Sequence, residues 1–472
     1  MSHPDEPRPE AGPSVPRRTF LASAAAVTAG FTIVPRHVLG GQATPAPSDK
    51  LHIACVGVGG MGKTNLTNCE TETIVALCDV DFTLSEPVFA KYPDARRYKD
   101  YRVMLDEQKD IDAVIIATPD HSHAVIAMAA MERKKHVYVQ KPLTHSVHEA
   151  RLLTETARKY GVATQMGNQG HSADSIRRCC EWVRDGAIGK AHTVRLQIGW
   201  VYSMIDKLPR LKETHAVPER LDWDLWLGPT PFRPYHPLYE PGQWRNWAPF
   251  GGGAIGDWIC HLGDPAFWAL ELGSPVSIQA QAAEFDPKVH GDTFPKGARV
   301  TFKFAENGKR GPVTLEWSDG WEKMKKPPEL EGDPDFPSIG GVILGDKGGI
   351  VYESHGARNL RLFPESLDKE YKRPARTIPR VRGMEEEKPK GHYDDWVRAH
   401  HEDWTRAIRE KGHVPSSNFE YGGALSELGL LANIAYRFPG QELRWDGPAM
   451  KFTNCPEANA FVNPPYREGW TL

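Results

Sequence analysis

Between residues 50 and 166 the chain alternates short apolar runs with stretches of helical periodicity. Short apolar runs bounded by glycine or polar residues indicate buried strands, and apolar positions three and four residues apart indicate helices. Strands that alternate with helices are typical of a parallel sheet covered by helices. The pattern predicts strands at 51–58, 73–78, 113–118, 136–139 and 162–166, and helices at 123–135 and 147–160.

After about residue 171 the pattern changes. Strands are no longer separated by regularly spaced helices, which indicates an antiparallel-rich α+β unit. The pattern predicts strands at 192–199, 276–283, 299–305 and 313–317, and helices at 175–185, 255–272, 395–410 and 424–437. Because 472 residues are too many for one ordinary domain, we expect one folded domain at 49–171 and a second at 172–472.

The first 48 residues are predicted to be an export signal and a linker. Arg17 and Arg18 precede an apolar run rich in alanine, and a linker of Pro, Ala and Ser follows. The run is shorter than the roughly 20 apolar residues that a membrane-spanning helix needs. Paired arginines before a modest apolar run are typical of a twin-arginine signal. We expect export to the periplasm or cell envelope without stable membrane insertion after signal removal; the alternative is a disordered basic tail.

Charge and cysteine content exclude several classes of protein. The chain has 58 Lys and Arg residues against 61 Asp and Glu residues, a formal net charge of -3, and no long block of one sign. This balance gives no electrostatic reason for a nucleic-acid partner, and we expect none. The seven cysteines form no CxxC pair, so neither a disulfide framework nor a zinc cluster is predicted. His121 and His123 form an HxH pair without a third ligand nearby in sequence, and we expect no metal.

A glycine-rich turn after the first predicted strand is the clearest motif. Gly57-Val58-Gly59-Gly60-Met61-Gly62 fits GxGxxG, opens a helical segment, and is followed by Asp79 at the end of the second strand. In this context the motif indicates a Rossmann dinucleotide-binding domain; the alternative is a glycine-rich turn without a ligand. Gly57 permits the tight turn, Gly59 lets backbone N–H groups approach a pyrophosphate, and Gly62 lets helix and strand pack closely. Asp79 favours NAD over NADP because its carboxylate accepts hydrogen bonds from ribose hydroxyls and repels a 2′-phosphate.

Several ordered motifs together resemble one enzyme family. Besides the glycine motif they are Ala117-Thr118-Pro119-Asp120-His121, Gln140-Lys141-Pro142 after the fourth strand, and the segment from Phe250 to His261. The chain resembles the Gfo/Idh/MocA family of NAD(P)-dependent oxidoreductases, and in particular its exported members, over nearly everything after the export signal. The resemblance implies an α/β protein with an N-terminal Rossmann domain, NAD as cofactor, and a C-terminal α+β domain. It also implies that the open, mostly antiparallel sheet of this second domain serves substrate binding and homo-oligomer formation.

The resemblance implies roles for particular residues. Lys141 would reach the nicotinamide and the reacting carbon of the substrate. Where the family has Glu before this lysine, the chain has Gln140, which keeps a hydrogen-bonding group and loses the charge. Asp257 and His261 match the family's acid/base pair. The residues implied in cofactor binding are Gly57, Gly59, Gly60, Met61, Gly62, Asp79, Thr118, Pro119, Asp120, His121, Lys141 and Asn168.

The residue types and their positions in the sequence fit this chemistry independently of the family resemblance. Lys141 lies just past a strand end, where open α/β sheets place their sites, and its ammonium can stabilise a developing oxyanion. Asp257 and His261 are four residues apart, so a helix would put both on one face, where the carboxylate can orient the imidazole as a general base. A solvated lysine, a helix cap and a core histidine are the structural alternatives. Asn168 follows the fifth strand and is expected to hydrogen-bond cofactor or substrate, with Asp264 as a further polar candidate.

All 14 tryptophans belong to the second domain, since the first is Trp182. We expect about half of the aromatic residues ahead of Asp257 to pack in the core or an interface, and the others to stack on a sugar ring. These aromatic residues are Trp200, Tyr202, Trp223, Trp226, Tyr235, Tyr239, Trp244 and Trp247.

The expected function is NAD-dependent oxidation of a sugar, polyol or glycoside by hydride transfer from a carbinol carbon. Two alternatives remain open from the sequence. One is a redox-assisted glycoside hydrolase with tightly bound, internally recycled NAD, which an exported enzyme without an external NAD pool would favour. The other is a non-catalytic carbohydrate-binding protein on the same scaffold.

Overall fold

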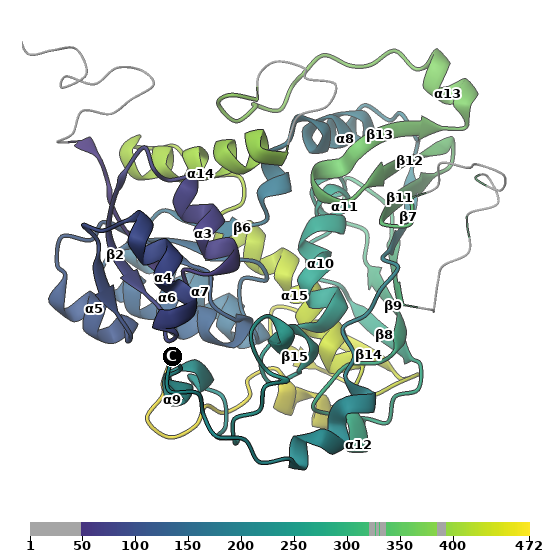
Figure 1. Cartoon of the computed structure of the whole chain (residues 1–472). Helices are drawn as coiled ribbons and strands as arrows, with labels where there is room; N and C mark the ends of the chain where they lie inside the picture. Colours follow the sequence, from purple (N-terminus) through teal and green to yellow (C-terminus); the bar gives the residue numbers. More distant parts are fainter. Residues whose placement is uncertain (1–48, 321–325, 327–329, 331–336, 385–392) are drawn as a thin grey trace, which may run out of the picture. The chain divides into compact units, whose positions relative to one another are not determined.

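The computed structural model describes residues 49–320, 326, 330, 337–384 and 393–472, and Leu51–Leu472 forms one compact unit built on two sheets (Figure 1). The predicted export signal and linker at 1–48 lie outside the described residues. In the part of the chain that the structure describes, each helix is too short or too polar to cross a lipid bilayer.

The first sheet has six strands in the order β3-β2-β1-β4-β5-β6, and every neighbouring pair is parallel. This is the strand order of a Rossmann fold, so the predicted N-terminal α/β domain is confirmed. The strands are β1 (His52–Val56), β2 (Thr73–Cys78), β3 (Arg96–Tyr98), β4 (Ala113–Ile116), β5 (His136–Gln140) and β6 (Thr164–Gly167). The sequence did not predict β3, because two of its three residues are exposed arginines.

Helices from both ends of the described chain cover this sheet (Figure 1). They are α3 (Gly60–Thr67), α4 (Phe82–Lys91), α5 (Tyr101–Glu107), α6 (His123–Glu132), α7 (Val147–Tyr160) and α14 (Tyr393–Arg409). The start of α7 is fixed by a capping box of Ser146 and Glu149, and its end by Gly161 in the left-handed region. Although α14 follows the second sheet in sequence, its Trp404 is fully buried in one cluster with Ile53 of β1 and Tyr138 of β5.

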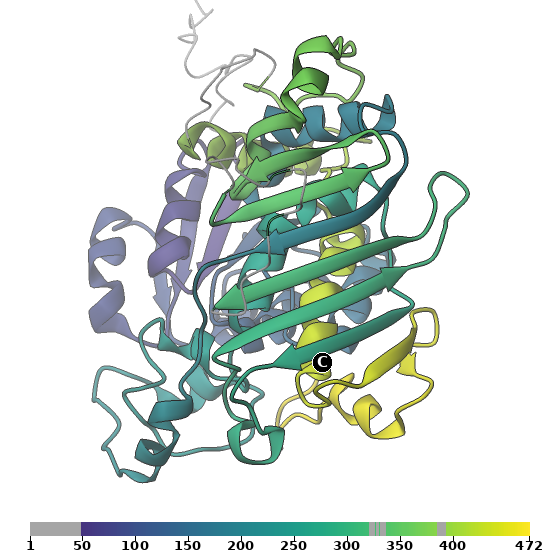
Figure 2. The same cartoon turned by 90° about the vertical axis from the view of Figure 1, so that its right-hand side faces the viewer.

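The second sheet has nine strands in the order β13-β12-β11-β7-β10-β9-β8-β14-β15, and all neighbouring pairs are antiparallel except β7 with β10. The predicted open, mostly antiparallel sheet is therefore confirmed. In Figure 2 its strands face the viewer, and most helices of the unit lie behind them. The strands are β7 (Ala191–Gln197), β8 (Ser277–Ala282), β9 (Gly297–Phe304), β10 (Val313–Gly320), β11 (Gly340–Gly345), β12 (Gly348–Glu353), β13 (Arg358–Phe363), β14 (Glu442–Asp446) and β15 (Lys451–Phe452).

A buried layer of helices joins the two sheets. Its helices are α8 (Asp174–Arg184), α10 (Gly253–Leu262), α11 (Asp264–Ala269) and α15 (Phe419–Ala435). Shorter elements complete the unit: η2 (Asp120–Ser122), η3 (Gln169–Ser172), η4 (Ile205–Lys212), α9 (Trp223–Leu227), η5 (Gln243–Asn246), α12 (Pro287–His290), η7 (His355–Ala357), α13 (Glu365–Glu370) and η8 (Pro456–Phe461).

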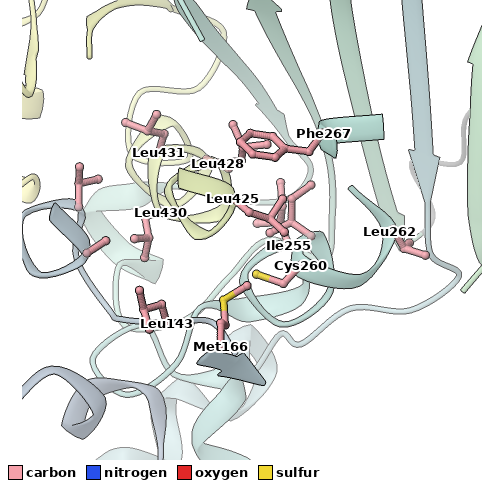
Figure 3. Packing of buried hydrophobic residues seen from close by; sticks show 14 of the residues in the cluster. Leu143, Met166, Ile255, Cys260, Leu262, Phe267, Leu425, Leu428, Leu430 and Leu431 are labelled. Atoms are coloured by element: carbon pink, nitrogen blue, oxygen red, sulfur yellow. The ribbon is translucent and has the colours of Figure 1, made fainter. Parts of the chain in front are cut away.

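The contact between α10 and α15 positions the region that carries Asp257 and His261. Leucines along α15 meet Ile255 and Cys260 of α10 in the core, and Leu143 and Met166 of the first domain lie at the same cluster (Figure 3). A Cβ added at Gly429 of α15 would lie 3.1 Å from the Cα of Gly256, so the absence of a side chain lets the two backbones approach closely.

The single helix predicted at 255–272 is two helices, α10 and α11. Pro265 lies in the first turn of α11, and a proline has no N–H to continue the hydrogen bonds of the preceding helix. Asp264 is therefore the first residue of α11 and not part of α10.

Candidate active site

In the loop between β1 and α3, two glycines pack closely against backbone and a third borders open space. A Cβ added at Gly57 would lie 2.8 Å from the backbone of Ala117, and one added at Gly62 would lie 1.9 Å from the carbonyl oxygen of Gly57. Gly59 differs, because a Cβ added there would meet no atom within 4 Å. Its backbone therefore borders open space beside the N-terminus of α3, where N–H groups and the helix dipole favour phosphate.

A cavity of about 480 Å³, named here the glycine-loop cavity, begins at this loop. Asp79 lies at its edge: one carboxylate oxygen accepts from the N–H of Val58 at 2.9 Å and the other from the N–H of Asp81 at 3.0 Å. Burial raises the pKa of Asp79. The predicted cofactor residues that line this cavity are Gly57, Gly59, Gly60, Met61, Asp79, Thr118, Pro119, Asp120 and Lys141.

Within the described residues, the buried hydroxyl of Thr118 has no hydrogen-bond partner, so it is available to a ligand in this cavity. An open backbone at a helix N-terminus, an acidic residue at the end of β2 and an unpartnered hydroxyl at the end of β4 are what a dinucleotide requires along a Rossmann sheet. The donor groups of the glycine-loop cavity therefore fit NAD.

Lys141, immediately after β5, lines the glycine-loop cavity. Its Nζ is 2.5 Å from Oδ1 of Asp257 and 3.0 Å from the carbonyl oxygen of the same residue. The other carboxylate oxygen of Asp257 accepts from the hydroxyl of Tyr202 at 3.0 Å, and Nε of Arg245 lies 3.5 Å from Oδ1. Burial alone would raise the pKa of Asp257, but the charges of Lys141 and Arg245 outweigh it and hold the pKa below its ordinary value.

A second cavity of about 580 Å³ adjoins the first, and we name it the Asp257 cavity. Its lining residues are Met61, Gln140, Lys141, Gln169, Tyr202, Gly242, Gln243, Arg245, Asn246, Asp257, Trp258, His261 and His355. Lys141 and Arg245 line both cavities. The structure thus brings the predicted residues Lys141, Asp257 and His261 to the lining of one cavity.

His261 lies one turn after Asp257 on α10 and is buried. Its ring centroid is 3.9 Å from that of His355, and within the described residues its Nδ1 has no hydrogen-bond partner. Burial, reinforced by His355 and Lys141, lowers the pKa of His261 well below its ordinary value. The imidazole is therefore neutral near pH 7.

One expectation about this pair needs correction. We predicted that the carboxylate of Asp257 orients His261, but in the structure the carboxylate is engaged by Lys141, Tyr202 and Arg245. The ammonium group is the nearest full charge, and a carboxylate pairs with it in preference to a neutral ring. Asp257 therefore holds Lys141, and the packing against His355 holds His261.

Gln140 is directed toward the first domain. Its side-chain amide donates to Oδ1 of Asn65 on α3 at 3.1 Å, and His401 of α14 contacts the same oxygen through Nε2 at 3.2 Å. Only 5% of Gln140 is exposed, although it borders both cavities. The residue that replaces the family's glutamate therefore links β5 to two covering helices.

Three predicted polar residues lie away from the Asp257 cavity. Asn168 is fully buried, donates to Asp264 at 3.0 Å and accepts from Ser417, so both ends of its amide are used inside the protein. Asp264 also accepts from His171 and belongs to this internal network. His121 contacts the carbonyl oxygen of Trp226 through Nε2 at 2.9 Å, which ties the turn after β4 to the aromatic segment.

Asp120 lines the glycine-loop cavity. Its carboxylate accepts from the N–H of Gly252 at 3.1 Å and anchors the start of α10. Burial raises the pKa of Asp120 to about 7, despite the opposing charge of Arg245.

Among the described residues, one group of three lies close enough together to be considered for a metal ion: Glu213, His215 and His236. It lies outside both cavities. Nδ1 of His236 accepts from the N–H of Leu238 at 3.1 Å, which leaves the proton on Nε2, the atom that would face an ion. This protonation does not favour metal binding.

The aromatic residues ahead of Asp257 divide into two groups. Five of them form a buried cluster, in which Trp223 and Trp226 are stacked with ring centroids 4.8 Å apart. Tyr202 lines the Asp257 cavity, Trp244 lines the glycine-loop cavity, and Trp200 packs against Trp258 with ring centroids 4.9 Å apart. The buried five are Trp223, Trp226, Tyr235, Tyr239 and Trp247.

Sequence reasoning missed Arg245 and His355 as site residues. They come from η5 and η7, short elements that lie far from Lys141 in the chain. Tyr202 was included only as one of many aromatic residues, and no local pattern distinguishes it. The available signal was the aromatic and polar composition of the segment before α10.

Two sequence profiles of one family match the chain. The profile described as "Oxidoreductase family, NAD-binding Rossmann fold" matches residues 51–168, and the one described as "Oxidoreductase family, C-terminal alpha/beta domain" matches residues 176–320. The chain belongs to the Gfo/Idh/MocA oxidoreductase family. The resemblance seen in the sequence is confirmed, and with it an NAD-binding first domain.

Curated relatives of this Gfo/Idh/MocA protein align over part of their length. The alpha-N-acetylgalactosaminidase of Shewanella oneidensis is 31% identical over 205 residues, which are 38% of this chain and 44% of that protein. The myo-inositol 2-dehydrogenase of Thermotoga maritima is 26% identical over 149 residues, 31% of this chain and 44% of that protein. The chain thus spans less than half the length of these relatives.

Solved structures extend the likeness over both domains of the Gfo/Idh/MocA fold. The aldose-aldose oxidoreductase of Caulobacter crescentus has a TM-score of 0.54 and 17% identity, with 84% of this chain and 100% of that chain covered. A levoglucosan dehydrogenase in complex with NADH and L-sorbose has a TM-score of 0.54 and 18% identity, with 84% and 98% covered. At this identity the comparison establishes the fold alone.

Proposed function

We propose that the protein is an NAD-dependent oxidoreductase that removes hydride from a carbinol carbon of a sugar, polyol or glycoside. The observation that supports this most is the position of Lys141, which lines both the glycine-loop cavity and the Asp257 cavity. A dinucleotide that follows the glycine loop would end where the substrate cavity begins. Oxidised nicotinamide, when bound, would accept the hydride.

The residues of the Asp257 cavity would stabilise the developing charge, accept the proton and bind the sugar. Lys141, held by Asp257, presents a cation that stabilises negative charge as it develops on the substrate oxygen. His261 is neutral and accepts the hydroxyl proton. The ring of Trp258 and the ring of Tyr202 border the same space and offer apolar faces to a sugar.

A redox-neutral glycoside hydrolase is the second candidate. It is favoured by the 31% identity to a relative named as an alpha-N-acetylgalactosaminidase. In such a reaction a ring hydroxyl is oxidised to a ketone, which acidifies the neighbouring C–H; the aglycone is eliminated, water adds, and the ketone is reduced again. The cofactor is restored in each turnover, which suits export of a folded protein with its cofactor bound. A carbohydrate-binding protein without catalysis is the third candidate.

Export and assembly belong to the same proposal. The paired Arg17 and Arg18 before an apolar run support delivery to the periplasm or cell envelope by the twin-arginine route. The broad nine-stranded sheet, which lies at one side of the unit, supports a homo-oligomer formed through the second domain (Figure 2). The same proposal divides the chain into a cofactor domain at 49–171 and a substrate domain at 172–472.

Mass spectrometry of the native, undialysed protein, followed by a screen of sugars and glycosides, tests the proposal. Retained NAD and accumulation of reduced cofactor with substrate support the dehydrogenase, and sugar release without net reduction supports the hydrolase. Lys141→Met and His261→Gln should abolish turnover and keep NAD, whereas Lys303→Met, at an exposed ion pair with Glu442, should change neither. A protein that binds sugars and turns over none contradicts both enzymatic candidates.

A further inference from the structure

The Asp257 cavity holds more positive than negative charge. Among its described lining residues, Lys141 and Arg245 are cations and Asp257 is the carboxylate that opposes them. Asp257 is already paired with Lys141 at 2.5 Å. His261 and His355 add no charge near neutral pH, because burial lowers both pKa values, that of His355 to about 4. Asp120, which lines the adjoining glycine-loop cavity and interacts with the charges of Arg245 and Lys141, has its pKa raised to about 7 by burial, so it offsets the excess positive charge only in part.

Arg245 makes the longer of the two cation contacts to Asp257, and the other carboxyl that its charge acts on, that of Asp120, has a raised pKa. Its Nε lies 3.5 Å from Oδ1 of Asp257, at the long end of the range for an ion pair, and that oxygen already receives the shorter contact from Lys141. Within the described residues no hydrogen bond engages its two terminal amino groups. The guanidinium carbon lies 4.2 Å from the ring centroid of Trp244, which holds the planar group in place while its side chain stays 33% exposed.

We propose that Arg245 binds an oxyanion on the substrate, so that the preferred substrate is an acidic sugar or glycoside carrying a carboxylate or a sulfate. The inference rests on the proposed function and names the substrate class of the same site. A guanidinium group matches both oxyanions with two parallel hydrogen bonds. Partial enclosure weakens screening by water, so the excess charge favours an anionic ligand over a neutral one. The volume of about 580 Å³ is typical of small-molecule sites.

Equilibrium binding of matched sugar pairs to the full chain with its cofactor tests this inference. The pairs are glucuronate with glucose, galacturonate with galactose, and glucose 6-sulfate with glucose, measured by calorimetry. We expect at least about tenfold tighter binding of the acidic member, since a hydrogen bond to a charged group contributes about 1.5–3 kcal/mol. A preference confined to the first two pairs identifies a carboxylate, and one confined to the third identifies a sulfate.

Three variants separate the role of Arg245 from a general effect on the site. Arg245→Gln should weaken the binding of acidic sugars by about 10- to 100-fold and change the affinity for neutral sugars by no more than about threefold. Arg245→Lys should fall between, because it keeps the charge and loses the paired donors. The matched control is Arg210→Gln: Arg210 pairs with Glu213 at 3.0 Å on η4, lies outside both cavities, and should change nothing.

Each other result overturns the inference. Equal affinity of the parent protein for both members of every pair would remove the anion requirement. If Arg245→Gln weakens the binding of both members of a pair equally, Arg245 positions Asp257 and does not bind the substrate anion. If the variant loses NAD, Arg245 binds the cofactor. Turnover of neutral sugars without preference would leave the proposed function standing and this inference refuted, whereas tight binding of acidic sugars without turnover of any would refute the function.

Discussion

Replacement of Gly59 by alanine separates cofactor binding from folding. Gly59 has φ −76° and ψ 176°, a conformation that alanine adopts freely, and an added methyl group meets no atom within 4 Å. Alanine lowers the entropy of the unfolded chain, which stabilises the fold by about 0.4–1 kcal/mol. Because alanine is a poorer residue than glycine just before a helix, a loss of similar size opposes this gain. We therefore expect the free energy of unfolding to change by less than about 1 kcal/mol.

The same methyl group projects beside the first turn of α3, where the pyrophosphate must approach the backbone. Losing one hydrogen bond to a charged group costs about 1.5–3 kcal/mol, so the affinity for NAD should fall by about 10- to 150-fold. Calorimetric titration with NAD measures the affinity, and thermal unfolding without added cofactor measures the stability. The NAD affinity of Gly59→Ala should therefore fall while its free energy of unfolding stays nearly unchanged.

Two further glycines provide controls for Gly59→Ala. An added Cβ at Gly199 also meets nothing within 4 Å, and Gly199 lies outside both cavities, so Gly199→Ala should change neither readout. Gly57 has φ +78° and a Cβ there would lie 2.8 Å from neighbouring backbone, so Gly57→Ala should lower stability itself. An unchanged NAD affinity in a folded Gly59→Ala protein would refute the placement of the pyrophosphate beside α3.

Three more outcomes follow from the same contacts. Because the folded-state pKa of Asp257 is lowered, its ion pair with Lys141 stabilises the fold at neutral pH, and this stabilisation is lost as the pH falls through and below the ordinary pKa of about 4. The difference in melting temperature between the parent protein and Asp257→Asn should therefore shrink between about pH 6 and pH 3. A constant difference over this range contradicts the expectation. Leu428→Ala should cost about 2–5 kcal/mol in urea unfolding, because Leu428 is fully buried between α15 and α10, and a loss within about 1 kcal/mol would contradict that packing. Tyr202→Phe should lower turnover and leave NAD affinity unchanged, since its hydroxyl contacts Asp257 and lines only the Asp257 cavity; weaker NAD binding would place it elsewhere.

The fold was predictable where local pattern and tertiary structure agree. The strands β1, β2, β4 and β5 of the first sheet each have an apolar run, because both faces of a parallel sheet are buried. The pattern did not reveal β11 and β12, because their apolar runs are only three residues long and lie beside glycines at 340, 341, 345, 348 and 349. It did not reveal β13, because Arg358, Asn359 and Arg361 break up its apolar residues. The helix predicted at 255–272 failed at Pro265, a residue that the periodicity of apolar positions does not register.

The site was predictable where one element supplies both the residue and its direction. Lys141 follows a parallel strand, and the carboxyl ends of such strands face the ligand, so its position could be inferred. Arg245 and His355 reach the cavity from short elements whose placement depends on the whole second domain, and no periodicity encodes that. Asn168 also follows a strand, but the network with Asp264 and Ser417 draws its amide into the protein.

The pairing of Asp257 with Lys141 accounts for the different charge states of two neighbouring groups, a cationic Lys141 and a neutral His261. The carboxylate and the ammonium neutralise each other's cost of burial, so both stay charged at a position of low exposure. The positive charge of Lys141 that remains near His261 then acts with burial to keep that imidazole neutral. Had Asp257 bonded His261, the ring would gain a proton and lose its capacity to accept one. The departure from the predicted contact therefore supports the proposed division of work, with a cation for the developing oxyanion and a neutral ring for the proton.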